Sequence, residues 1–145
     1  MNVSITECIK EATAGSFDEP FHKFLGLEER MVNGERIYFM AFRDEHVGNP
    51  LIGTFHGGIL ASFGEVVAAR YLAQHCGDAA LPTCSTMTFD YMRPAFAGKL
   101  QAIPTMIRVG RRIATVSVEL RVESKVVCIG RFIFTVDRKG LDIKT

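Results

Sequence analysis

The sequence predicts an α+β domain in which one curved antiparallel sheet of about six strands wraps around one long helix. The first observation behind this prediction is a run of helical character from Gly57 to His75, rich in alanine and free of proline. The second is the alternation of apolar and polar residues in the segments around this run, which is the period of half-buried strands. The third is that no other long apolar element is present, so this helix must cover the apolar face of the sheet.

The elements before the helix begin with a hairpin. We assign residues 25–145 to a single domain and residues 1–24 to a preceding helical or irregular segment. Asn33-Gly34 separates two strand-like runs, and it is a strong signal for a two-residue hairpin turn because both central positions of that turn need a positive φ. Residues 44–55, which contain glycine, asparagine and proline, form a loop that leads to the helix.

Four strands follow the helix, over residues 83–93, 100–109, 113–122 and 126–136. The alternation is clearest in the third of these strands, where one face is formed by Ala114, Val116, Val118, Leu120 and Val122. Short turns join the strands, so we expect them to pair with their sequence neighbours as a meander. Pro104 cannot donate to a ladder, and it indicates an edge or a bulge in its strand.

The composition is that of an ordinary globular protein, with 48% hydrophobic residues, 23% charged residues and a formal net charge of +1. Such a balance argues against nucleic-acid binding, and no apolar run reaches the roughly 18 residues of a membrane span. The first residues lack the apolar core of a secretory signal, so we expect a cytoplasmic protein. The four cysteines and four histidines show no ligand spacing, which predicts that there is no metal site.

The long helix is apolar on nearly all of its sides, and such a helix is buried on more than one side. One sheet covers one side only. We therefore expect a second copy of the chain to pack close to the helix, which predicts a homodimer.

Glu65 is the one ionisable residue between His56 and Arg70. Removing a carboxylate from water costs several kcal/mol unless partners compensate. One interpretation is that Glu65 faces solvent or packs under a polar neighbour. The other is that it is held in a partly dry cleft as a base or a nucleophile. The residues alone leave both interpretations open.

Gly57 and Gly58 stand at the predicted helix start, where backbone N–H groups are unpaired and carry partial positive charge. This end suits a carbonyl oxygen that gains negative charge, although two glycines also suit a tight junction between loop and helix. Gly58 and Glu65 are about 10 Å apart along the axis, so the acid does not reach its own helix end. It could reach the end of an antiparallel partner helix, which predicts a composite site if both residues are functional.

The segment "NPLIGTFHGG", the acid in the helix that follows, and the strands with "FDYMRPAFAG" and "VGRRIATVSVEL" together resemble the hot-dog-fold acyl-CoA thioesterases, in particular the PaaI-like group. The resemblance covers about Leu25 to Val136. It implies that the N–H of Gly57 or Gly58 polarises the thioester carbonyl. It also implies that Glu65 of the facing subunit acts as nucleophile or as general base for water.

The resemblance implies supporting roles for further residues. His56 would support the loop or the thioester end, and Asn49 would help to hold the reacting water. A hydroxyl near the start of the next strand assists the acid in some relatives, and here the register decides between Thr83, Cys84 and Ser85. The remaining candidates would line the acyl pocket or meet the coenzyme A phosphates, although they also suit core packing and solvated turns: Phe63, Tyr91, Arg93, Lys99, Arg111 and Arg112.

The expected function is hydrolysis of an acyl- or aryl-CoA thioester to the free acid and coenzyme A, by a homodimer that pairs into a homotetramer. No cofactor is implied beyond the coenzyme A of the substrate. One alternative is hydratase or dehydratase chemistry on the same fold, but the Pro-Gly helix entry of those relatives is missing. The other is a non-catalytic acyl-CoA-binding protein, but such relatives tend to lose the helix acid that is present here.

Overall fold

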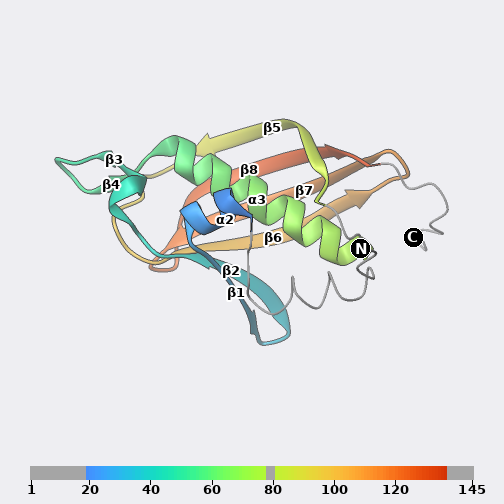
Figure 1. Cartoon of the computed structure of the whole chain (residues 1–145), viewed down its shortest axis with the longest axis horizontal. Coiled ribbons are helices and arrows are strands. Elements are labelled where there is room, and N and C mark those ends of the chain that lie inside the picture. The colour runs from blue at the N-terminus through green and yellow to red at the C-terminus, as the bar shows by residue number, and fades with distance from the viewer. Residues whose placement is uncertain (1–18, 78–80, 137–145) are drawn as a thin grey trace.

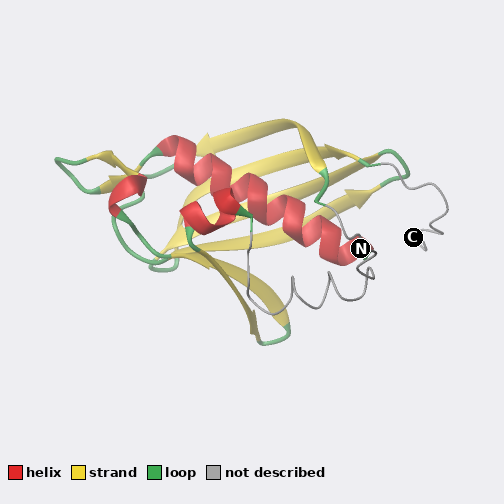
Figure 2. Cartoon of the chain, in the orientation of Figure 1, coloured by secondary structure: helices red, strands yellow, loops and turns green. Residues whose placement is uncertain are grey.

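The structure is a computed structural model that describes residues 19–77 and 81–136 (Figure 1). One six-stranded antiparallel sheet carries the long helix α3 (Gly57–Cys76) on one face, as Figure 2 shows. The strands are β1 (Leu27–Val32), β2 (Glu35–Met40), β5 (Thr83–Tyr91), β6 (Leu100–Val109), β7 (Ile113–Val122) and β8 (Lys125–Thr135). The predicted α+β architecture, a curved sheet of six strands around one long helix, is confirmed.

The N-terminal part of the described chain is the short helix α2 (Pro20–Leu25), which ends at Gly26 with a φ of 73°. The hairpin of β1 and β2 follows. Its turn residues Asn33 and Gly34 have φ values of 51° and 79°, so the predicted two-residue turn is confirmed. Most of the predicted segment 1–24 lies outside the described residues.

The position of β5 corrects the expected meander. The strands run in the order β1-β2-β6-β7-β8-β5, so β5 pairs with β8 and not with β6. Residues 92–99 form a crossover rather than a tight turn, and the N–H of Met92 donates to the Val127 carbonyl at 2.8 Å at its start. The place beside β6 is taken by β2, which pairs through Tyr38 and Ala102. As a result, β5 is an edge strand.

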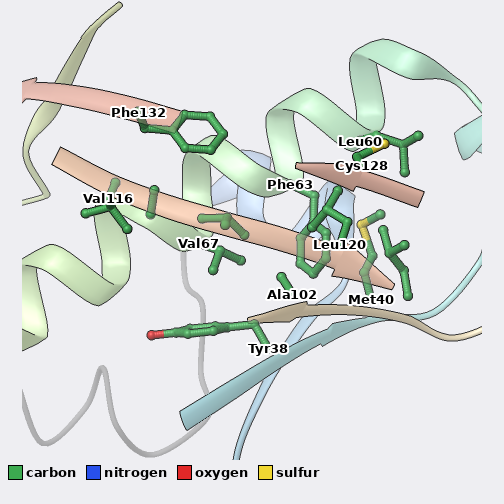
Figure 3. Close-up of a cluster of buried hydrophobic side chains, with 14 of the residues drawn as sticks. Tyr38, Met40, Leu60, Phe63, Val67, Ala102, Val116, Leu120, Cys128 and Phe132 are labelled. Carbon is green, nitrogen blue, oxygen red and sulfur yellow. The ribbon is translucent and has the colours of Figure 1, made fainter. Parts of the chain in front are cut away.

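The core lies between α3 and the inner face of the sheet (Figure 3). The alternation in β7 is confirmed, because Ala114, Val116, Val118, Leu120 and Val122 are all buried. From the helix, Phe63 and Val67 are fully buried in the same cluster. Within residues 19–77 and 81–136, no helix has both the length and the hydropathy to cross a bilayer.

Two glycines allow aromatic rings to fill the space between α3 and the sheet. A Cβ atom on Gly64 of the helix would lie 2.8 Å from Cζ of Phe132 and 3.0 Å from Cε2 of Phe89. A Cβ atom on Gly130 of β8 would lie 2.5 Å from Phe132 and 2.7 Å from Phe89. Phe132 is fully buried, and its ring meets that of Phe89 edge to face. These two rings therefore hold α3 at a fixed distance from β5 and β8.

Pro104 is predicted to mark an edge or a bulge of its strand, and it lies where β6 is paired on one side only. It pairs with Val118 of β7, whereas the pairing of β6 with β2 ends at Ala102. The bulge in β6 lies further along, between Met106 and Arg108. At Pro104, β6 therefore has a paired neighbour on one side only, which is the kind of position that tolerates a residue without an N–H.

Candidate active site

The loop before α3 holds His56 against a small hairpin of β3 (Val47–Asn49) and β4 (Thr54–Phe55). The His56 N–H donates to the carbonyl of His46, the last residue of the 3-10 helix η1 (Asp44–His46), at 2.7 Å. A Cβ atom on Gly48 would lie 2.6 Å from Cα of His56. Only glycine at this position allows β3 to pass so close to the residue that starts the helix.

His56 caps the helix and changes which glycine amide is available. Its Nδ1 accepts a hydrogen bond of 2.9 Å from the N–H of Gly58. The N–H groups of Ile59 and Leu60 donate to the His56 carbonyl, at 2.9 and 3.1 Å. Among the described residues, the N–H of Gly57 has no acceptor. Gly57 and Gly58 are both candidates from the sequence. Of the two, it is therefore Gly57 whose N–H is available to a ligand at the positive end of the helix.

Tyr91 approaches the same helix start from β5. Its hydroxyl donates to the carbonyl of Gly57 at 2.7 Å, and its ring lies beside the Cα of Gly57. Figure 1 shows that β5 ends at the end of the sheet where α3 begins. Tyr91 is one of the substrate-binding candidates predicted from the sequence, but no sequence pattern predicts its contact with the helix.

Glu65 lies about 12 Å along the axis from Gly57, at 1.5 Å per residue, and is half-buried. Within residues 19–77 and 81–136 its carboxylate makes no hydrogen bond and no ion pair. Its charge acts on Cys84 of β5: burial raises the pKa of the Cys84 thiol, and the charge of Glu65 raises it further. Cys84 stays a neutral thiol, and its Sγ donates to the Thr86 carbonyl at 3.3 Å.

The register of β5 decides which of the three candidates at its start faces the helix. Cys84 pairs with Phe134, which is buried under α3, so Cys84 lies on the helix side. Thr83 pairs with Thr135, and the hydroxyl of Ser85 is hydrogen-bonded to that of Thr135. Cys84 is thus brought to the side of Glu65, whereas Thr83 and Ser85 face the other side of the sheet.

The other candidates are held by contacts of their own. Asn49 is exposed in β3, and its Oδ1 accepts from the N–H of Leu51 at 3.0 Å. The guanidinium of Arg93 donates to the Val126 carbonyl at 2.9 Å. The ammonium of Lys99 lies 4.7 Å from the ring centre of Phe39. Phe63 is a core residue with no exposed surface.

Arg111 and Arg112 lie in the turn between β6 and β7, where both are exposed. The register places this turn far from Gly57 of the same chain, because Ile113 is level with Thr83 at the start of β5 and Tyr91 is at its end. The structure therefore does not bring these arginines to the helix start of their own protomer. Among the described residues, no group of three or more histidine, cysteine and acidic side chains is arranged to hold a metal ion.

Comparison with known proteins shows the family of the chain. A family model described as the thioesterase superfamily matches residues 52–129, which contain His56, Gly57, Glu65 and Tyr91. No curated protein matches the chain.

Solved structures are similar over most of the chain. The phenylacetic acid degradation-related protein of Ralstonia eutropha JMP134 is 25% identical, with a TM-score of 0.76 over 88% of this chain and 98% of that one. A mutant of the phenylacetic acid degradation protein PaaI of Thermus thermophilus is 28% identical, with a TM-score of 0.68 over 81% and 100%. PaaI of Escherichia coli, 23% identical with a TM-score of 0.71 over 91% and 95%, shows the same fold.

Proposed function

The chain belongs to the thioesterase superfamily, and on that premise we propose that it hydrolyses an acyl- or aryl-CoA thioester to the free acid and coenzyme A. The observation that carries the proposal is the open N–H of Gly57 at the first turn of α3. A thioester oxygen bound there accepts this N–H and gains negative charge as the carbonyl carbon is attacked. The partial positive charge of the helix end stabilises that oxygen further.

The acid that promotes the attack comes from a second copy of the chain in this proposal. Glu65 lies about 12 Å along the helix axis from Gly57 of its own chain, which is too far for its carboxylate to serve that amide. The edge strand β5 offers a way to bring a second Glu65 close. Its nine residues carry one charge, at Asp90, whereas the opposite edge strand β1 carries Glu28, Glu29 and Arg30. Charged edges resist pairing with another chain, so β5 is the edge suited to a second copy.

Antiparallel pairing of β5 with its copy about a two-fold axis places the start of one strand beside the end of the other. Tyr91, at the end of β5, contacts Gly57, and Cys84, near the start, lies on the side of Glu65. The pairing therefore brings Glu65 of the partner subunit toward the open N–H of Gly57. The partner's Arg112 comes to the same end of the sheet. It directly precedes the partner's β7, which is separated from the partner's β5 by β8 alone. A guanidinium in this position is suited to bind the phosphates of coenzyme A.

The reaction needs no group beyond the substrate, water and these residues. As a general base, Glu65 of the partner subunit takes a proton from water while the water oxygen attacks the carbonyl carbon. The C–S bond then breaks, and the proton passes to the sulfur of coenzyme A. As a nucleophile, the same carboxylate attacks the carbonyl carbon and expels the thiolate, and water opens the resulting anhydride.

The experiment that tests this function is thiol release from a panel of aromatic and aliphatic acyl-CoA thioesters of increasing chain length. We expect the wild-type protein to release coenzyme A from at least one thioester with saturation kinetics. The absence of thiol release from the whole panel, together with measurable acyl-CoA binding, would replace hydrolysis by the binding-protein alternative. Hydration of an enoyl-CoA without thiol release would instead favour the hydratase alternative.

A further inference from the structure

We propose that Tyr91 is a positioning residue, whose hydroxyl and ring fix the Gly57 peptide so that its N–H is aimed at the thioester oxygen. The inference rests on the proposed function, and it assigns to Tyr91 a task other than lining the acyl pocket. The hydroxyl donates to the Gly57 carbonyl at 2.7 Å, which ties the first residue of α3 to the last residue of β5.

The ring of Tyr91 packs tightly against Gly57. A Cβ atom on Gly57 would lie 3.2 Å from Cε1, 3.3 Å from Cζ and 3.4 Å from Oη of Tyr91. These distances are tight, so the ring would have to move to admit a methyl group. Gly57 thus has two reasons to be glycine, because its N–H must be accessible to a ligand and its Cα lies against an aromatic ring.

Tyr91 is itself held in place by β5 and its neighbours. It pairs with Cys128 of β8, and the ring of Phe89 meets its ring edge to face at 5.0 Å between centres. The next residue, Met92, is fixed by the bond of its N–H to the Val127 carbonyl. Burial raises the pKa of Tyr91, so the hydroxyl keeps its proton and remains a donor throughout the neutral range.

The position of a single N–H donor decides how well it stabilises charge in a reaction. Donors of this kind must stay within about 0.5 Å of the productive geometry, and the ends of helices open more readily than their centres. His56 holds the first turn from one side through Gly58, and Tyr91 holds it from the other through Gly57. Without the hydroxyl, the turn that carries the open N–H loses one of these two hydrogen bonds.

The test is the substitution Tyr91→Phe, which removes the hydroxyl and keeps the ring. We expect kcat for thiol release to fall by about tenfold, the effect of one lost hydrogen bond of ordinary strength, while KM changes by less than about twofold. Tyr71→Phe is the matched control, because Tyr71 is half-buried on α3 and its side chain makes no hydrogen bond among the described residues. This control is expected to keep the wild-type kcat.

A second readout does not depend on activity. Hydrogen exchange of the amides of Gly58, Ile59 and Leu60, which donate to His56 in the first turn of α3, is followed by NMR. We expect it to be faster in Tyr91→Phe than in the wild-type protein, with unchanged exchange in the centre of α3. A wild-type kcat in Tyr91→Phe, a change in KM alone, or unchanged exchange of these first-turn amides would overturn the assignment. An inactive wild-type protein would contradict the proposed function, and the exchange measurement would still decide whether Tyr91 holds Gly57.

Discussion

Replacing Glu65 with glutamine is expected to lower kcat for thiol release by about 10²-fold or more, with the protein still folded. Glutamine has nearly the same shape as glutamate, but it neither accepts a proton nor attacks a carbonyl carbon. The carboxylate of Glu65 makes no hydrogen bond or ion pair within the described part of its own chain, so little packing is lost with the charge. The measurement is steady-state thiol release by the two proteins at equal protomer concentration.

Glu35→Gln is the matched control for this substitution. Glu35 is exposed at the start of β2, on the hairpin, and the same chemical change there is expected to leave kcat unaltered. A Glu65→Gln protein with kcat within about twofold of the wild type would show that the acid is not the reacting group.

Replacing Phe132 with alanine is expected to lower the free energy of unfolding by about 3–5 kcal/mol, the range for removal of a buried phenylalanine ring. The ring is fully buried and fills the space that Gly64 and Gly130 leave between α3 and the sheet. Both glycines lack side chains that could close the cavity. The measurement is denaturant unfolding at a fixed protomer concentration, since a protein that associates has a concentration-dependent stability.

Phe96→Ala is the control for the loss of an aromatic ring. Phe96 is 53% exposed in the connection between β5 and β6, and its truncation is expected to change the free energy of unfolding by less than about 0.5 kcal/mol. A loss of less than about 1 kcal/mol in Phe132→Ala would contradict packing in which this ring separates helix and sheet.

The elements of this fold follow from local sequence patterns, and their arrangement does so only in part. Asn33-Gly34 predicts its turn because the two positive φ values are a property of those residues. The alternation in β7 predicts which side is buried, because side chains of a strand point to opposite faces in turn. The partner of β5 has no such local signal. Its pairing with β8 depends on the crossover of residues 92–99 and on β2 taking the place beside β6.

In the candidate site, too, some features follow from the local sequence and others depend on the folded arrangement. His56, Gly57 and Glu65 are close together in the sequence and form one motif, so the sequence alone identifies them as candidates. The choice between the amides of Gly57 and Gly58 depends on the ring of His56, whose Nδ1 occupies one of them. The bond from Tyr91 to Gly57 joins residues 34 positions apart, and no pattern in the sequence indicates it.

The central claim is that each site combines Gly57 of one subunit with Glu65 of the other, and subunit mixing tests it most directly. Glu65→Gln chains and Gly57→Val chains, carrying different affinity tags, are refolded together, and the mixed dimers are isolated through both tags. Each parent protein is expected to be nearly inactive alone. A mixed dimer contains one site with both an intact Gly57 and an intact Glu65, so it is expected to have about half of the wild-type activity. Mixed dimers no more active than their parents, or the absence of dimers, would contradict the composite site.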